Sequence, residues 1–218
     1  MKRIPEPQIM SPTEEAQQYH EMDHGEVNRK FVTELTAGPV GERIIDLGCG
    51  PAAIPIEICR RLDSVRVMAL DQEIEMLEIA KREIDLAGLL DRIELQCVDA
   101  ANMSDFEDEI ADVVISNSLI HHLDQPELGV ATAVRLLRVG GRLFVRDLFR
   151  PESMDEVEAL VRQYAGSENE LAQQLFRQSF QAALTLEEIR EIARGLNIDA
   201  EHVQMSSDRH WTIDWKKD

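Results

Sequence analysis

Residues 43–54, RIIDLGCGPAAI, decide the fold of this chain. The apolar run Arg43–Leu47 predicts a buried strand, and the glycines that follow it predict a tight turn into a helix over residues 52–62. Glycine lets the backbone turn sharply and approach a ligand closely. The N-terminus of a helix after such a turn favours negative charge. This stretch therefore predicts the first strand, turn and helix of an α/β sheet with a ligand at the turn.

The alternation of strand and helix continues along the chain. Apolar runs predict strands over residues 65–70, 92–98, 111–116 and 142–148, with helices over 73–87 and 126–138 between them. Strands that alternate with helices imply a mostly parallel sheet with helices on both faces, which is the doubly wound α/β class. Ligands of such sheets bind beyond the carboxyl ends of the strands.

The flanking segments differ from this unit. Residues 1–12 hold three prolines and predict a loose arm, and helices follow to about residue 37. Residues 151–183 predict two helices inserted after the fifth strand, and Thr185 with Glu188 predicts a capping box. Two final strand-like segments, near 198–204 and 210–215, predict an antiparallel hairpin. We expect an N-terminal helical lid over residues 1–38 and one domain over 39–218 that carries the insert 151–183.

The composition limits the classes of partner that we expect for this chain. The chain has 218 residues, with 42 Asp plus Glu against 23 Lys plus Arg, and a net charge of −19. Such an acidic surface repels phosphate backbones and anionic lipid, so neither nucleic acid nor a membrane is expected as a partner. The three cysteines form no CxxC pair, so no metal site and no disulfide framework are expected. No signal peptide or membrane-spanning run is found, which predicts a soluble, cytoplasmic protein.

Three acidic residues follow the predicted strands and indicate the ligand. Asp71 ends the second strand, where a carboxylate can accept both hydroxyls of an adenosine ribose. Asp46 precedes the glycine turn, where it would repel a pyrophosphate and attract an ammonium group. Asp99 ends the third strand, where it can accept a hydrogen bond from an adenine amino group, with the N–H of Ala100 placed to donate to the ring. Together they describe an adenosine with a zwitterionic, cationic tail.

These motifs resemble those of the class I S-adenosylmethionine-dependent methyltransferases, small-molecule type. The resemblance lies in residues 46–50 (DLGCG), Asp71, residues 98–100 (VDA), residues 115–123 (ISNSLIHHL) and residues 140–145 (GGRLFV), and it covers roughly residues 40–150. It implies a Rossmann-like fold, S-adenosyl-L-methionine as cofactor and a small-molecule methyl acceptor. The cofactor-binding residues implied are Asp46, Gly48, Cys49, Gly50, Asp71, Gln72, Asp99, Ala100, Ser116 and Asn117.

The glycine turn departs from the family pattern at one position. The family usually has a third glycine where this chain has Ala52, and Pro51 before it lacks an N–H. The added methyl group narrows the turn and bears on the strength of cofactor binding.

Methyl transfer from a sulfonium needs a positioned nucleophile, and a general base only where the nucleophile carries a proton. The catalytic candidates are His121, His24 and Asn117, each of which has an equally ordinary structural role. The insert 151–183 is expected to form the acceptor site. Arg146 and Arg150 are expected to grip an anionic group of the acceptor, with an Asp147–Arg150 ion pair as the alternative. Tyr19, Tyr164 and Trp211 are expected either as aromatic walls of the acceptor site or as core packing.

Two other functions compete with methyl transfer. Gly48-x-Gly50-x-x-Ala53 with Asp71 also fits the fingerprint of a dinucleotide site, which would suit an NAD-dependent oxidoreductase. Ala52 and the absence of an obvious base would suit a non-catalytic cofactor-binding protein of the same fold. The sequence determines neither the methyl acceptor nor the oligomeric state.

Overall fold

The structure is a computed structural model that describes residues 1–7, 11, 13–14, 17–18 and 25–218. Two expected site residues, Tyr19 and His24, lie outside the described residues. The strands are β1 (Arg43–Leu47), β2 (Arg66–Asp71), β3 (Ile93–Cys97), β4 (Ala111–Asn117), β5 (Leu137–Leu148), β6 (Val203–Met205) and β7 (His210–Lys216). The helices are α2 (Gly25–Thr36), α3 (Ala53–Arg61), α4 (Ile74–Leu86), α5 (Pro126–Leu136), α6 (Met154–Ala165), α7 (Glu170–Ala182) and α8 (Leu186–Gly195). Two 3₁₀ turns, η1 (Ile120–His122) and η2 (Ala200–His202), complete the described elements.

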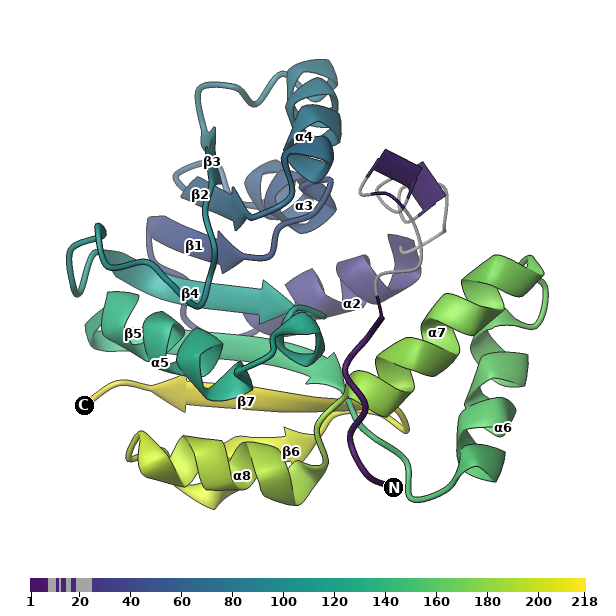
Figure 1. The fold of residues 1–218 in the computed structure, drawn as a ribbon. Helices are drawn as coiled ribbons and strands as arrows, with labels where there is room; N and C mark the ends of the chain where they lie inside the picture. Colours follow the sequence, from purple (N-terminus) through teal and green to yellow (C-terminus); the bar gives the residue numbers. More distant parts are fainter. Residues whose placement is uncertain (8–10, 12, 15–16, 19–24) are drawn as a thin grey trace.

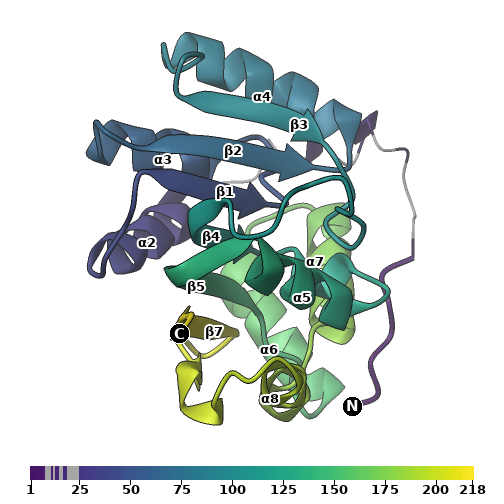
Figure 2. The same ribbon diagram turned by 90° about the vertical axis from the view of Figure 1, so that its left-hand side faces the viewer.

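The seven strands form one sheet in the order β3-β2-β1-β4-β5-β7-β6 (Figures 1 and 2). Strands β1 to β5 are parallel, whereas β7 is antiparallel to both β5 and β6. The predicted fold class is therefore confirmed, including the antiparallel hairpin at one edge of the sheet. The order reverses between β1 and β4, and such a switch point is where doubly wound sheets bind ligands.

Alternate residues of the strands face opposite layers of helices. Ile44 belongs to a core with α2, α3 and α4, and its neighbour Ile45 to a core with α5 and α8. A strand with both faces covered is apolar throughout, which explains the continuous run that marks β1 in the sequence. Among the helices of the described residues, none has both the length and the apolar composition needed to span a bilayer.

Three boundaries differ from expectation. α5 ends at Leu136, two residues early, because Leu137 already pairs with Ala111 in the sheet. β5 consequently begins five residues before the predicted strand. In the hairpin, residues 200–202 form the turn η2, so β6 is limited to Val203–Met205. Thr185 and Glu188 form the predicted capping box of α8.

The insert forms a separate layer at the end of the sheet. α6 and α7 pack on each other beyond the carboxyl ends of β4 and β5 (Figure 1). Their core includes Val157, Val161 and Phe180 and reaches Leu148 at the end of β5. The predicted two-helix insert is thus present, and it stands over the edge of the sheet where ligands bind.

The described N-terminal residues are bound to the domain. The amino group of Met1 donates to the carbonyl of Glu152, and the N–H of Ile4 donates to the carbonyl of Gln181. Arg3 donates to the carbonyls of Ala182, His121 and Leu123 at 2.7, 3.1 and 2.7 Å. The prediction of a loose arm is wrong for residues 1–7, because these long-range hydrogen bonds hold the segment against α7 and η1.

Candidate functional site

The glycine turn has three residues in the left-handed backbone region, with φ of 71° at Gly48, 51° at Gly50 and 62° at Ala52. Glycine adopts this conformation without strain, whereas alanine does so at a cost. The N–H groups of Gly48 and Cys49 both donate to the carbonyl of Leu70, at 2.8 and 2.9 Å. The turn is therefore fixed to the end of β2, beside the N-terminus of α3.

Asp71 holds this turn in place. One of its carboxylate oxygens accepts the N–H of Gly50 at 2.8 Å, and the other accepts the N–H of Glu73 at 3.0 Å. Burial raises its pKa, and these backbone hydrogen bonds partly oppose that rise. Asp71 therefore joins the turn after β1 to the start of α4, whatever ligand it also contacts.

Asp46 lies buried below the turn, with a side chain that is 2% exposed. Burial first, and the charge of Asp71 second, raise its pKa well above the ordinary value. Burial first, and then the charges of Asp46 and Asp71, raise the pKa of the Cys49 thiol. A negative charge at Asp46 is thus costly until a positive group lies beside it.

Residues at the ends of β2 and β3 meet as the sequence suggested. Asp71 pairs with Cys97 in the sheet, and the thiol of Cys97 donates to the carbonyl of Gln72. Asp99 is exposed and accepts the N–H of Ala101 at 2.8 Å, while Ala100 is buried. The roles of Asp99 and Ala100 at the adenine of a cofactor stay a prediction.

The end of β4 connects the glycine turn to the insert. Ser116 is buried and its hydroxyl donates to the carbonyl of Leu47 at 2.9 Å. Asn117 is half-buried and precedes Ser118, whose φ is 61°. A Cβ atom at Gly48 would lie 2.8 Å from Cδ1 of Leu119, so only glycine allows this approach.

A cavity of about 220 Å³ opens beside this point. It lies between the end of β4, η1, the start of α2, the insert and the N-terminal segment. Both polar and apolar side chains line its wall, among them Asn117, His121, Tyr164, Phe176, Arg209 and His210. Its position at the carboxyl end of β4, next to the glycine turn, makes it the candidate acceptor pocket.

His121 lies in the wall of this pocket with a fixed orientation. Its Nδ1 lies 2.5 Å from Oδ1 of Asp147, and its backbone N–H donates to Oδ2 of the same carboxylate at 3.0 Å. Asp147 is fully buried. Burial acts to raise its pKa, but the charge and hydrogen bond of His121 outweigh burial and lower it. Because a carboxylate only accepts, the ring donates from Nδ1 to Asp147, and this bond fixes the orientation of the imidazole.

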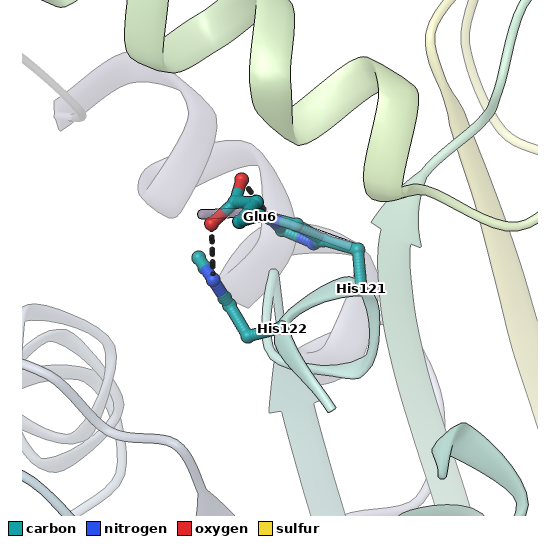
Figure 3. A group of neighbouring side chains, drawn as sticks. All are labelled: Glu6, His121 and His122. Carbon is teal, nitrogen blue, oxygen red and sulfur yellow. Dashed lines mark ion pairs between the residues drawn. The ribbon is translucent and has the colours of Figure 1, made fainter. Parts of the chain in front are cut away.

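Glu6 approaches both histidines of η1 (Figure 3). Its Oε2 lies 2.7 Å from Nδ1 of His122, and its Oε1 lies 3.8 Å from Nε2 of His121. Burial acts to raise the pKa of Glu6, yet the hydrogen bond and charge of His122, with the charge of His121, lower it to about 2. Glu6 was not predicted as a site residue from the sequence. The only hint in the sequence was indirect. Asp147 is a charged residue in an apolar strand and needs a partner from a neighbouring element, and that partner, His121, is the residue that Glu6 approaches.

The other expected acceptor residues have structural partners. Arg146 is buried and bonds to Glu34 of α2 and to the hydroxyl of Thr212 in β7. Arg150 donates to the carbonyl of Ala183 and to Glu188. The alternative Asp147–Arg150 ion pair is wrong, because Asp147 binds His121 instead. Trp211 is fully buried in the core beside α8.

Comparison with protein families identifies the central part of the chain. Residues 45–145 match the family model described as "Methyltransferase domain". This range begins in β1 and ends in β5, so it includes the glycine turn, Asp71, Asp99 and the histidine pair.

Curated relatives of this chain are named as methyltransferases. The chain is 26% identical over 157 residues to the methyltransferase GfsG of Streptomyces halstedii, covering 72% of this chain and 53% of that protein. It is 25% identical over 120 residues to the ubiquinone biosynthesis O-methyltransferase of Idiomarina loihiensis, covering 55% and 48%. It is 30% identical over 123 residues to the demethylmenaquinone methyltransferase of Clavibacter sepedonicus, covering 56% and 48%. The chain spans about half the length of these relatives.

Solved structures share the fold over most of the chain. A candidate S-adenosyl-L-methionine-dependent methyltransferase from Methanococcus maripaludis aligns with a TM-score of 0.74 and 21% identity, covering 99% of this chain and 98% of that one. The plantazolicin methyltransferase BpumL, in complex with SAH, aligns with a TM-score of 0.67 and 18% identity, covering 84% and 68%. At these identities the likeness concerns the fold.

Proposed function

Because the chain belongs to the class I S-adenosylmethionine-dependent methyltransferases, we propose that it transfers the methyl group of S-adenosyl-L-methionine to a nucleophile on a small molecule. In this reaction the nucleophile forms a bond to the methyl carbon, the bond from that carbon to sulfur breaks, and S-adenosylhomocysteine leaves. The cofactor supplies the leaving group and the positive charge. The chain has to bind both partners, align them and exclude water.

One observation carries the proposal: the glycine turn and the pocket lie side by side. β1 and β4 are neighbouring strands, with Leu47 paired to Ser116, so their carboxyl ends meet. Leu119, which follows β4, packs against Gly48 of the turn. A cofactor on the turn would therefore direct its reactive end toward the pocket beside Asn117.

The three carboxylates take separate parts of the cofactor in this proposal. Asp71 accepts the ribose hydroxyls, Asp99 the adenine amino group, and Asp46 faces the ammonium of the methionine part. The buried position of Asp46 suits a positive group and not a pyrophosphate, which favours this cofactor over NAD. The remaining contacts come from Gly48, Cys49, Gly50, Gln72, Ala100, Ser116 and Asn117.

The pocket beside η1 receives the acceptor. The insert supplies Tyr164 and Phe176 to its wall, and β7 supplies His210. Residues 151–183 thus act as the acceptor-site insert of the domain, and residues 1–38 as its lid. Relatives named for ubiquinone biosynthesis and for demethylmenaquinone suggest an acceptor of small-molecule size. The free thiols Cys49, Cys59 and Cys97 suit a reducing compartment, so we place the protein in the cytoplasm.

The test is calorimetric titration of the purified chain with S-adenosylmethionine and S-adenosylhomocysteine, with NAD as the control ligand. We expect both sulfur compounds to bind and NAD not to bind. Asp99→Ala is a sharper test than Asp71→Ala, because the exposed side chain of Asp99 accepts an N–H only two residues away, from Ala101, whereas Asp71 supports two separate elements. Binding of NAD alone would sink the proposal in favour of an oxidoreductase.

A non-catalytic cofactor-binding protein is the second candidate, and the strained Ala52 favours it. Incubation with methyl-labelled cofactor and a panel of phenols, thiols and amines separates the two. Tight cofactor binding without label transfer to any acceptor would favour the second candidate.

A further inference from the structure

Among the residues that the structure describes, one group of histidine and carboxylate side chains brings its ligand atoms to a single point. Glu6, His121 and His122 place one carboxylate oxygen and two ring nitrogens within 4.8 Å of one another (Figure 3). From the sequence, only the cysteines came into question as metal ligands, and no metal was expected. We propose that these three residues form a mononuclear site for a divalent first-row transition ion, of which zinc is the natural choice.

The distances fit such an ion. Two ligands about 2.0–2.1 Å from a tetrahedral zinc ion lie roughly 3.3–3.4 Å apart. Oε2 of Glu6 lies 2.7 Å from Nδ1 of His122, and its other oxygen, Oε1, lies 3.8 Å from Nε2 of His121. One separation is shorter and one longer than the tetrahedral value. Because a different oxygen makes each of them, a rotation of the carboxylate and small side-chain shifts have to bring one oxygen and both nitrogens around the ion.

The surroundings of His121 are those of a metal-bound imidazole. Ligating histidines usually donate their second ring N–H to a carboxylate, which fixes the tautomer and makes the free nitrogen more basic. Asp147 does this at Nδ1, from a fully buried position, while Nε2 lies on the side of Glu6.

The segment that carries Glu6 is held against the histidines by separate contacts. Arg3 donates to the backbone carbonyls of His121 and Leu123, on either side of His122. The relative position of the three ligands therefore does not depend on the Glu6–His122 bond alone. The guanidinium of Arg3 donates to carbonyls and not to Glu6 in these contacts.

The donor set selects the class of ion. Two imidazole nitrogens and one carboxylate suit zinc, iron and their neighbours, whereas magnesium and calcium prefer oxygen ligands. Three protein ligands leave a coordination position open, as in catalytic sites. All three residues line the acceptor pocket. An ion in this site could bind an acceptor oxygen at the open position and lower the pKa of that oxygen. This role rests on the proposed function, whereas the binding of the ion itself does not.

The experiment is titration of the full chain, freed of metal by chelator and dialysis, with zinc in competition with a chromophoric chelator. The titration contains no cofactor, so its result can be interpreted even if the chain proves not to be a methyltransferase. We expect one zinc ion per chain. Glu6→Gln and His122→Gln should each weaken binding at least about tenfold, since each removes a ligand.

Glu168→Gln is the matched control, because Glu168 lines the same pocket but lies outside the group of three. It should bind zinc as the unaltered chain does. Asp147→Asn should weaken binding by roughly 10- to 100-fold while all three ligands remain, with circular dichroism to verify the fold.

Replacement of zinc by cobalt, followed by X-ray absorption spectroscopy, then identifies the atoms bound to the ion. We expect only nitrogen and oxygen neighbours. A sulfur neighbour would place the ion at a cysteine such as the exposed Cys97 and overturn the proposal. Absence of stoichiometric binding, or binding that survives both Glu6→Gln and His122→Gln, would overturn it as well.

Discussion

The carboxylate of Asp71 accepts the backbone N–H of Gly50 across 2.8 Å, and this bond joins the end of β2 to the turn that follows β1. The residue that is expected to hold the ribose therefore also builds the site that surrounds the ribose. Its second oxygen accepts the N–H of Glu73 before α4, so the side chain supports two neighbouring elements at once. A loss of ligand binding in an Asp71 variant consequently has two possible causes.

Substitution of Asp71 should lower both stability and cofactor affinity. Loss of two charge-assisted hydrogen bonds in Asp71→Ala should cost about 2 kcal/mol in the free energy of unfolding, measured by urea denaturation without ligand. Asp71→Asn keeps one acceptor oxygen and should lose less. Equal stability of Asp71→Ala and the unaltered chain would show that these backbone bonds contribute nothing.

Asp46 should lower the stability of the ligand-free protein and raise its affinity for the cofactor. Burial and the charge of Asp71 raise its pKa, so the native state holds its proton more tightly than the unfolded state does. The free energy of unfolding then falls as pH rises from the ordinary value of 3.8 toward the raised value. At neutral pH, Asp46→Asn removes this cost, and the melting temperature of the ligand-free protein should rise.

The same variant should bind S-adenosylmethionine about thirtyfold more weakly, because roughly 2 kcal/mol of charge-assisted interaction with the ammonium is lost. Where the ligand-free protein holds the proton, binding should release it, and calorimetry in buffers of different ionisation enthalpy measures that release. A variant that is less stable yet binds normally would contradict both parts of the argument.

Patterns local in the chain predicted most of the fold. The apolar run of β1, the glycines after it and the capping box at Thr185 each depend on residues a few positions apart. The acceptor side was harder, because its contacts join distant segments. Asp147 was matched with Arg150, three residues away, whereas in the fold it meets His121 on the loop after the neighbouring strand. Glu6 was assigned to a loose arm because prolines surround it, and only the fold brings it to His122.

Gly48 and Leu119 should behave as a coupled pair. A methyl group at Gly48 would meet Cδ1 of Leu119 at 2.8 Å and its Cβ at 2.9 Å, with φ already at +71°. Gly48→Ala should therefore cost about 2–3 kcal/mol and weaken cofactor binding. Leu119→Ala removes Cδ1 but leaves Cβ, so the double variant should recover part of the loss. Strict additivity in this double-mutant cycle would show that the contact is absent in solution.

Ala52 should tolerate glycine in spite of its left-handed backbone. Relief of strain at φ of 62° would gain about 1–2 kcal/mol. Glycine would lose about 0.5–1 kcal/mol through chain entropy, and the buried methyl group contributes about 0.8 kcal/mol. These effects nearly cancel, so Ala52→Gly should change the free energy of unfolding by less than about 1 kcal/mol. Ala52→Val, branched and fully buried at positive φ, should be destabilised by more than about 2 kcal/mol.

Asp112 should make stability sensitive to acid. Its carboxylate accepts the N–H groups of Glu42 and Arg43 and pairs with Arg138 at 2.8 Å. Burial acts to raise its pKa, but these bonds and charges outweigh burial and lower it. A lowered pKa in the native state gives stability that is complete above the ordinary value of 3.8 and is lost as pH falls through the native-state value.

Asp112→Asn should consequently be less stable than the unaltered chain at pH 7, by about 1–3 kcal/mol. The difference should shrink when the unfolding experiment is repeated below about pH 4, where the aspartate takes up a proton. Asp108→Asn serves as the control, because Asp108 forms one exposed ion pair with Arg135 and exposed pairs contribute little. If the loss of stability in Asp112→Asn did not depend on pH, the shape of the side chain, and not its charge, would account for the stability that Asp112 gives to the start of β1.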